Sequence, residues 1–365
     1  MNLTKHQRIV VKIGSSLLIS SNKLNFSWLK TIAADISELI AEGKQVIIVT
    51  SGAVALGRKA IGKTSGELKL EEKQAASACG QTELMQGYAK AFAPLNVAQI
   101  LITFWDTERR RNYLNAKSAM ETLLENGAIP IINENDVVAT TELAYGDNDR
   151  LSARVAQMLG ADLLVLFSDV DGLYDKNPQQ YADAKHIEQV KEITTEIENM
   201  AGAPLTMYGT GGMKTKIEAA KIAVNAGCAC VLTSGKANHA VKALFAKKQR
   251  FTIFEPIINA LTARKRWIVS GVKAMGEVIV DDGAAKALGK GKSLLPAGVV
   301  SISGKFERGD LVVIKNNNQE IARGLSEYSI ENAKQIIGKK SAEIEKILGY
   351  SGRAALVHRD DLVVL

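Results

Sequence analysis

The sequence predicts an α/β protein: a doubly wound, mostly parallel sheet sandwiched between helices, followed by a small, mostly β domain. From about residue 8 to 260, apolar runs rich in Val, Ile and Leu alternate with longer segments of helical pattern. Such runs are typical of parallel strands buried on both faces, and their alternation with helices is typical of a doubly wound sheet. After residue 267 the runs are short and are separated by Gly and Asn turns, which favours a β domain.

Strands and helices can be placed in both parts. We expect helices over 26–43, where Trp28, Ile32, Ile36 and Leu39 recur at helical spacing, and over 71–93. The second part should hold one helix, around 327–338. Domains are therefore expected at residues 1–260 and 273–365, with a linker at 261–272. The expected strands are RIVVKIG (8–14), QVIIVTSG (45–52), VAQILITF (97–104), AIPIINEN (128–135), ADLLVLFSD (161–169), CACVLTSG (228–235), GEVIV (276–280), VVSISG (299–304), DLVVIK (310–315), AALVH (354–358) and DLVVL (361–365).

Composition favours a cytoplasmic globular protein. Of the 365 residues, 46% are hydrophobic and 23% are charged. No apolar run approaches the roughly 18 residues of a membrane span, and the N-terminal stretch shows no signal-peptide pattern. The three Cys and four His have no metal-ligand spacing, so we expect neither disulfides nor a structural zinc. The net charge of +7 alone is a weak hint of anionic partners.

Residues 57–64 read GRKAIGKT and satisfy the P-loop pattern at every position. A working P-loop needs a strand that ends at its first Gly and a helix that starts at its Lys. Here the strand-like run ends at Thr50, and Ala53, Leu56 and Ala60 have helical spacing. We therefore expect GRKAIG near the end of a helix and place phosphate binding elsewhere.

The first candidate phosphate loop is VVKIGSSLL, residues 10–18. Lys12 lies inside an apolar strand, and Gly14 follows at its end. A buried Lys is costly without an anionic partner, and Gly lets a backbone approach a phosphate closely. The stretch therefore favours an anion site over the alternative, a strand-to-loop turn with an incidental Lys.

Two further loops have similar character. In VTSGAVALG, Ser51 and Gly52 lie where a strand turns into a helix, whose exposed N–H groups attract anions. An ordinary N-cap would account for this Ser equally well. In YGTGGMKTKIEAAKIA (208–223), Lys214 and Lys216 begin a helix, where cations oppose the macrodipole and a bound anion would offset that cost. A surface loop is the alternative there.

Carboxylates and amides gather in two neighbouring stretches. The strand IPIINEND ends in Asn133, Glu134, Asn135 and Asp136, and YGDNDRLSARVA places Asp147, Asn148 and Asp149 before a helix. Such a group can grip an amino group, position lysines or hold Mg²⁺. Helix capping by Asp149 is the structural alternative, but capping accounts for one of these residues and not for six.

A turn-rich loop, SDVDGLYDKNP, follows the strand LLVLF at residues 168–178. Ser168 and Asp169 lie at the carboxyl end of that strand, which is where ligands bind in open α/β sheets. Contact with a nucleotide and a simple turn are equally compatible with this stretch.

Together these stretches resemble the amino acid kinase family. The opening Lys-Gly-Ser-Ser, VTSGAVALGRK, INENDVVA, YGDNDRLSARVA, FSDVDGLYDKNP and GTGGMKTKIEAAKIA occur in the family's order and cover nearly the whole first domain. The second domain resembles a PUA domain. The combination is similar to the members that act on glutamate, although Tyr145 and Ser168 replace the family's usual Phe and Thr.

The resemblance implies a function and a site. It implies transfer of the γ-phosphoryl group of ATP, with Mg²⁺, to the side-chain carboxylate of L-glutamate, the first step toward proline. It also implies proline as a feedback inhibitor and a homodimer or homotetramer. The catalytic residues would be Lys12, Lys216 and Asp149, and Ser51, Gly52, Asp136 and Asn148 would bind glutamate. The ATP-binding residues would be Lys12, Gly14, Ser168, Asp169, Thr210, Gly211, Gly212, Met213, Lys214, Thr215 and Lys216.

Three alternatives remain at this level. PUA domains often bind RNA, but residues 267–365 hold 14 basic and 12 acidic side chains, too even a balance to indicate an RNA-binding surface. Other kinases of the same family act on acetylglutamate, aspartate, carbamate or uridylate. A P-loop NTPase would rest only on GRKAIGKT and on LLVLFSD, which resembles a Walker B strand. We expect no protein ligands to a metal.

Overall fold

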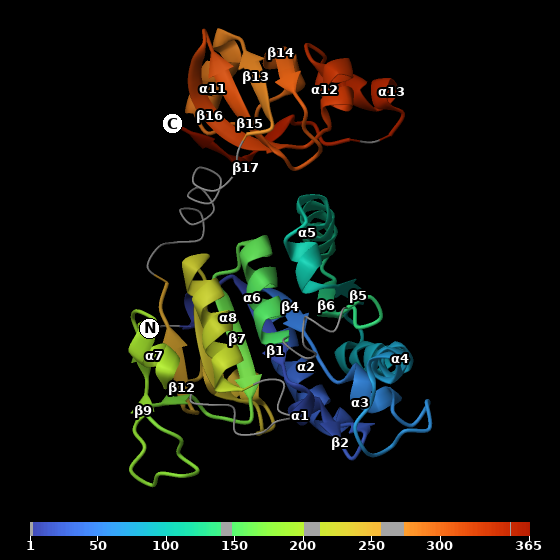
Figure 1. The fold of residues 1–365 in the computed structure, drawn as a ribbon, viewed down its shortest axis with the longest axis vertical. Coiled ribbons are helices and arrows are strands. Elements are labelled where there is room, and N and C mark those ends of the chain that lie inside the picture. The colour runs from blue at the N-terminus through green and yellow to red at the C-terminus, as the bar shows by residue number, and fades with distance from the viewer. Residues whose placement is uncertain (1–2, 140–147, 201–211, 257–273, 351) are drawn as a thin grey trace. The chain divides into compact units, whose positions relative to one another are not determined.

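The chain forms two compact units in a computed structural model that describes residues 3–139, 148–200, 212–256, 274–350 and 352–365 (Figure 1). One unit comprises Met1–Glu108 and Asn115–Ala260, and the other comprises Arg109–Leu114 and Leu261–Leu365. No helix in the described part of the chain is both long and apolar enough to span a membrane.

The first unit is built on an eight-stranded sheet (Figure 1). Neighbouring strands run parallel except β11 and β12, which are antiparallel. All six strands expected in this part of the sequence are present, and the predicted doubly wound, mostly parallel sheet is confirmed. In sheet order the strands are β10 (Gln189–Val190), β12 (Phe251–Phe254), β11 (Ala229–Ser234), β7 (Leu163–Ser168), β1 (Arg8–Ile13), β4 (Gln45–Val49), β6 (Ile129–Glu134) and β5 (Val97–Ile102).

Helices cover both faces of this sheet. On one face α6 (Asn148–Leu159) packs against α8 (Met213–Asn225) and over β1, β7 and β11. On the other face α2 (Phe26–Ala41) packs against α4 (Leu70–Phe92) and α9 (Ala240–Phe245). The remaining elements of the first unit are α1 (Ser15–Leu18), α3 (Ala53–Gly57), α7 (Thr195–Asn199), two 3-10 turns (Leu3–Lys5 and Phe104–Thr107) and the short hairpins β2 (Ile19–Ser20)–β3 (Lys23–Leu24) and β8 (Leu173–Tyr174)–β9 (His186–Ile187). Helix α5 (Arg110–Glu125) belongs to the first unit from Asn115 onward.

Strand β1 places the side chain of Lys12 on the sheet face that α6 and α8 cover. Ile9, Val11 and Ile13 belong to the hydrophobic core shared with α2, so the alternate residues of the strand point to the face covered by α6 and α8. Lys12 is one of these. Its backbone pairs in parallel register with Val49 of β4 and Leu166 of β7, so the residues after these three strands emerge at one edge.

The second unit has a five-stranded sheet in the order β14-β13-β15-β16-β17. Its core includes Val278, Phe306, Ile314 and Leu356. The bounds are β13 (Gly276–Val280), β14 (Val299–Gly304), β15 (Leu311–Asn316), β16 (Gln319–Ser326), β17 (Val357–Val364), α11 (Asp282–Gly289), α12 (Ile330–Ile336), α13 (Ile344–Leu348) and two 3-10 turns (Pro296–Gly298 and Ser341–Glu343).

Three details of the second unit correct the sequence interpretation. The expected single helix is present as α12, but α11 and α13 accompany it. Strand β16 was not expected, because QEIARGLS has few β-branched residues, and it forms by pairing with both β15 and β17. The two runs AALVH and DLVVL contribute to one strand, β17, rather than two.

Candidate active site

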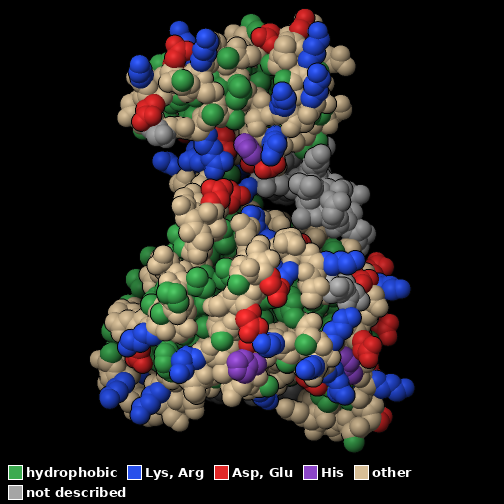
Figure 2. Space-filling view, turned by 180° about the vertical axis from the view of Figure 1, so that it is seen from behind, with side chains coloured by type: hydrophobic (Ala, Val, Ile, Leu, Met, Phe, Trp, Pro, Cys, Tyr) green, Lys and Arg blue, Asp and Glu red, His purple; other side chains and the backbone are tan. Residues whose placement is uncertain are grey.

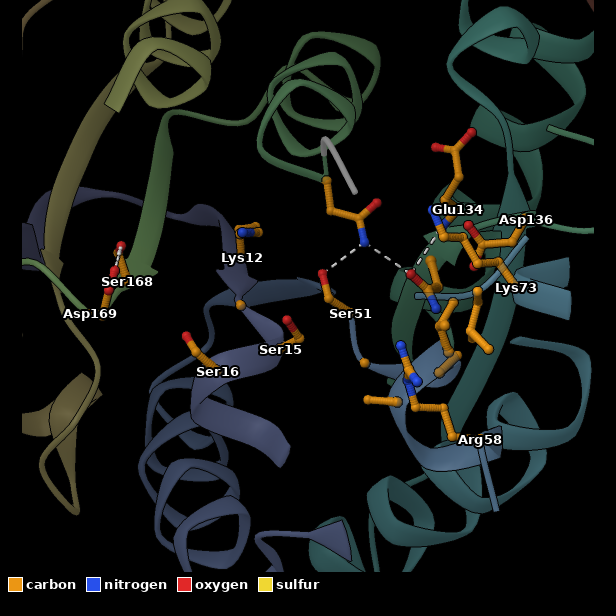
Figure 3. A pocket seen from close by; sticks show the side chains of 18 of the residues that line it. Lys12, Ser15, Ser16, Ser51, Arg58, Lys73, Glu134, Asp136, Ser168 and Asp169 are labelled. Carbon is orange, nitrogen blue, oxygen red and sulfur yellow. Dashed lines mark hydrogen bonds between the residues drawn. The ribbon is translucent and has the colours of Figure 1, made fainter. Parts of the chain in front are cut away.

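A cavity of about 810 Å³ opens at the carboxyl ends of β1, β4, β6 and β7. Figure 3 shows Lys12, Ser168 and Asp169 toward one side and Arg58, Lys73, Glu134 and Asp136 toward the other, with Ser51 between them. The cavity is lined by Lys12, Gly14, Ser15, Ser16, Ser51, Gly52, Ala53, Val54, Ala55, Arg58, Gly66, Glu67, Leu68, Lys73, Asn133, Glu134, Asp136, Asn148, Phe167, Ser168, Asp169 and Lys216.

One carboxylate holds both predicted catalytic lysines. The Nζ atom of Lys12 lies 2.6 Å from one oxygen of Asp149, and Nζ of Lys216 lies 3.1 Å from the other. The three residues come from β1, α6 and α8, which the packing of these helices over β1 brings together. All three side chains are buried. The anionic partner that the buried Lys12 requires is therefore Asp149.

The environment of Asp149 favours its charged form. Burial alone would raise the pKa of this carboxyl, but the ammonium groups of Lys12 and Lys216 outweigh burial and lower the pKa. Helix α6 begins at Asn148, so Asp149 lies in its first turn and is not the N-cap that the capping interpretation required. The hydroxyl of Thr215 is a further donor to the same carboxylate, at 3.2 Å.

The amide side chains of Asn148 and Asn133 form a hydrogen-bonded pair in the site. Nδ2 of Asn148 lies 2.6 Å from the carbonyl oxygen of Thr50, 2.8 Å from the hydroxyl oxygen of Ser51 and 3.0 Å from Oδ1 of Asn133. Asn148 is only 4% exposed, and its buried Oδ1 has no hydrogen-bond partner among the described residues. An unsatisfied buried acceptor at a cavity wall favours a bound donor, such as an ammonium group.

Asp136 follows β6 and also lines the cavity. Burial raises the pKa of its carboxyl, and a hydrogen bond from the hydroxyl of Ser77, 2.5 Å from Oδ2, opposes that shift. Within the described residues no group of three or more His, Cys, Asp and Glu side chains could hold a metal ion.

The predicted phosphate loops lie at the starts of helices. Gly14 is the N-cap of α1, and Gly52 is the N-cap of α3. Gly52 has a φ of +101°, and a Cβ there would lie 2.8 Å from the side chain of Ile19, so glycine is required. Ser168 ends β7 and donates to Asp169, 3.0 Å away. These residues line the cavity.

The glycine-rich segment before α8 is described only in part. Thr210 and Gly211 lie outside the described residues. Gly212 is the N-cap of α8, and Met213, Lys214 and Thr215 form its first turn with Lys216. Of these described residues only Lys216 lines the cavity, and Lys214 is exposed.

The structure adds residues that sequence reasoning missed. Arg58 and Lys73 line the cavity on the side of Asp136 (Figure 3). Ser77 of α4 contacts Asp136, and Gln81 of the same helix contacts Asn133. Ser77 and Gln81 gave no signal in the sequence, because they lie on a helix outside the recognised motifs. Only their helical spacing from Lys73 onward would have placed them on one face.

The string GRKAIGKT does not have P-loop geometry. Strand β4 ends at Val49 and α3 ends at Gly57, so the string starts where a helix ends. Ala60, expected in the helix, lies beyond it in a turn. Lys63 pairs with Glu72 at 3.2 Å, and its side chain is 54% exposed.

Comparison with known proteins places the chain. A model of the amino acid kinase family matches residues 7–234, and a model of the PUA domain matches residues 276–348. A glutamate 5-kinase of Rhizobium rhizogenes (strain K84 / ATCC BAA-868) is 53% identical over 100% of this chain and 94% of its own length. A glutamate 5-kinase of Paramagnetospirillum magneticum (strain ATCC 700264 / AMB-1) is 52% identical over 99% of each chain. The chain belongs to the amino acid kinase family and carries a C-terminal PUA domain, as its motifs predict.

Proposed function

We propose that this chain phosphorylates the side-chain carboxylate of L-glutamate with ATP, giving L-glutamyl 5-phosphate for proline biosynthesis. The similarity to glutamate 5-kinases over the full chain supports this activity. The observation that carries it is the Lys12–Asp149–Lys216 cluster at one side of a cavity whose opposite side holds Asp136 (Figure 3). Its volume of about 810 Å³ is within the ordinary range for small-molecule sites.

The chemistry needs charge compensation rather than a strong base. An oxygen of the substrate carboxylate forms a bond to the γ-phosphorus while the bond to the bridging β,γ-oxygen breaks, and ADP leaves with that electron pair. A carboxylate is already a nucleophile, so catalysis consists of positioning and electrostatic stabilisation. Lys12 and Lys216 would neutralise the two anions that meet, and Asp149 would hold both ammonium groups in place.

The opposite side of the cavity suits the amino acid end of glutamate. Asp136 offers a carboxylate to the α-ammonium group, and the unsatisfied Oδ1 of Asn148 offers a second acceptor. Ser51 and the backbone at Gly52 would contact the rest of the substrate. Acetylglutamate has no free α-ammonium group, so this arrangement favours glutamate.

The nucleotide would lie toward Gly14, Ser168 and Asp169, with the start of α8 around its phosphates. Mg²⁺ would enter with ATP, held mainly by phosphate oxygens and water. It would neutralise phosphate charge. Lys12 and the hydroxyl groups of Ser15, Ser16 and Ser168 lie toward that side of the cavity and suit the phosphate anions (Figure 3).

Regulation, assembly and location are proposed from the family resemblance and composition. We keep proline as feedback inhibitor, a homodimer or homotetramer as the assembly, and the cytoplasm as the location, consistent with three free cysteines. We do not propose RNA as a partner. Figure 2 shows acidic and basic side chains interspersed over the visible face of the second unit.

The test is ATP turnover by the purified chain with Mg²⁺, with acyl phosphate trapped by hydroxylamine. We expect hydroxamate with L-glutamate and none with acetylglutamate or aspartate. ATP hydrolysis at a rate that does not depend on glutamate would contradict the proposal. In that case Lys63→Ala would decide for or against a P-loop enzyme, since this change should abolish only P-loop activity.

A further inference from the structure

Helix α4 presents a row of three polar side chains to the strand and loop that carry Asp136. Gln74, Ser77 and Gln81 are spaced three and four residues apart, so they share one face of the helix. Nε2 of Gln74 donates to the carbonyl oxygen of Ala139 at 3.3 Å. Oγ of Ser77 donates to Asp136 at 2.5 Å.

The third member of the row, Gln81, contacts the amide side chain of Asn133. Oε1 of Gln81 accepts from Nδ2 of Asn133 at 2.9 Å, and Oδ1 of Asn133 accepts from Asn148. The row therefore holds the end of β6 and the loop after it at three successive points. Beyond Glu134 this loop is not part of the sheet, and Val137 and Val138 are exposed. N of Asn135 donates to the carbonyl oxygen of Ile102 of β5 at 3.1 Å, and the contacts with α4 hold the segment that follows.

Helix α4 is itself held rigidly beside the cavity wall. It crosses α3 at Gly57 and Gly80, so closely that a Cβ on Gly57 would lie 1.8 Å from the carbonyl oxygen of Ala76. A Cβ on Gly80 would lie 1.9 Å from that of Ala53. Since α3 begins in the cavity wall, this crossing fixes the Ser77 hydroxyl relative to the substrate side of the cavity.

We propose that Ser77 is a positioning residue for the amino acid substrate: its hydroxyl holds Oδ2 of Asp136, so that Oδ1 is presented to the substrate ammonium. Within the described part of the chain Asp136 has no other hydrogen-bond partner. Ser77 is 5% exposed, so water does not readily replace its hydroxyl. This inference rests on the proposed function, which gives Asp136 an ammonium group to bind.

The hydrogen bond also affects when Asp136 is charged. A donor to the ionised carboxylate opposes the effect of burial, so removing it should raise the pKa of Asp136 further. Substrate affinity should then begin to fall at a higher pH. The other charged groups that line this cavity, which are unchanged by a Ser77 substitution, are Arg58, Glu67, Lys73, Glu134, Lys12, Asp169 and Lys216. Asp149 pairs with the two lysines Lys12 and Lys216.

The test compares Ser77→Ala, Ser77→Thr and the control Ser37→Ala in the full chain. Ser37 is a helical serine of α2 whose hydroxyl donates to the carbonyl oxygen of Ala33 in the same helix. We expect Ser77→Ala to raise the KM for glutamate about tenfold, the size of one hydrogen bond to a charged group. We expect kcat and the KM for ATP to stay within about twofold.

Two further readouts separate positioning from a structural role. In Ser77→Ala the pH below which the KM for glutamate rises should move upward. Ser77→Thr should return both this pH and the KM toward the wild-type values. An unchanged KM with a superimposable pH profile would overturn the proposal. So would an equal loss in all kinetic constants that Ser77→Thr does not restore.

Calorimetric binding of glutamate at several pH values separates this inference from the proposed function. If the wild-type chain binds glutamate without phosphorylating it, the proposed function fails and the Kd of Ser77→Ala still decides the role of Ser77. If the wild type binds no glutamate, both are overturned.

Discussion

Asp149 is the residue on which the charge balance of the site depends. Its two oxygens contact the ammonium groups of Lys12 and Lys216, and it is 2% exposed. Two cations this close would repel each other strongly without the carboxylate between them. The same cations are what a phosphoryl group meeting a carboxylate requires, so the site is built to receive negative charge.

Replacing Asp149 by Asn should therefore reduce both stability and activity. The change leaves two buried ammonium groups without a counter-charge, which costs about 3–5 kcal/mol in comparable buried pairs. Urea unfolding of the variant should show this loss. The exposed pair Lys221–Glu198 provides a control, because Glu198→Gln should change the unfolding free energy by less than about 1 kcal/mol. Equal stability of Asp149→Asn and wild type would contradict the assigned pairing.

The contribution of Asp149 should also depend on pH in a defined direction. Its pKa is lowered in the folded state, so its stabilisation is complete above the unfolded value of about 3.9 and is lost as pH falls through the folded pKa. The difference in unfolding free energy between wild type and Asp149→Asn should be constant from neutral pH to about 5 and shrink below about 4. A difference that grows on acidification would show the opposite sign.

At this scale the sequence revealed the residues that stand inside motifs. Lys12, Asp149 and Lys216 were identifiable because a charge inside a buried strand, or a cluster of charges at helix starts, needs a partner. Ser77 and Gln81 were not identifiable, because a polar residue on a helix is ordinary until the neighbouring strand is placed against it. Asn133 was visible only as one member of an acidic-amide cluster.

Among the elements, the crossing of α3 and α4 determines the shape of the substrate side. Gly57 and Gly80 let the two backbones touch, and each backbone occupies the space of a side chain on the other. Long segments of clear pattern predicted α2, α4 and six of the eight strands of the first sheet, but no periodicity predicts which two helices will approach this closely.

Gly80→Ala should separate the two helices. The added methyl group overlaps backbone that cannot rotate away, so we expect a loss of about 3 kcal/mol or more in unfolding free energy. The KM for glutamate should rise as well, because α4 carries Ser77. Gly289→Ala is a matched control at the end of α11, where a Cβ meets nothing within 4 Å. If Gly80→Ala were as stable as that control, the close crossing would be wrong.

Among the elements of the second unit that sequence reasoning missed are β16 and α11. Strand β16 depends on two neighbouring strands rather than on its own residues. Helix α11 contains Gly at its second and last positions, which weakens the helical pattern that its alanines and the Asp281 cap support. The strands β13, β14 and β15, which have Val and Ile runs, were correctly expected.

Each of the two compact units has a hydrophobic core of its own in the part of the chain that the structure describes. One includes Ile9, Val11 and Trp28, and the other includes Val278, Phe306 and Ile314. The texture change near residue 267 was enough to predict two domains, because an apolar run that alternates with helices and one that alternates with turns cannot belong to one sheet architecture.

Calorimetric unfolding should therefore show two transitions. ATP analogue and glutamate should raise only the transition of the unit that holds the cavity, by up to about 2.7 kcal/mol at 100-fold excess over Kd. Ile314→Ala, at a fully buried position of the second core, should lower only the other transition, by about 2–4 kcal/mol. A single transition that both changes shift together would contradict this independence.

The most direct test of the account is the turnover of Lys216→Ala beside Lys221→Ala in the glutamate-dependent hydroxamate assay. Lys216 is buried against Asp149, whereas Lys221, on the same helix, is exposed and pairs with Glu198. The account predicts that Lys216→Ala lowers kcat by at least about 100-fold with little change in folding, while Lys221→Ala keeps wild-type turnover. Near-normal turnover by Lys216→Ala would contradict the role given to the Lys12–Asp149–Lys216 cluster.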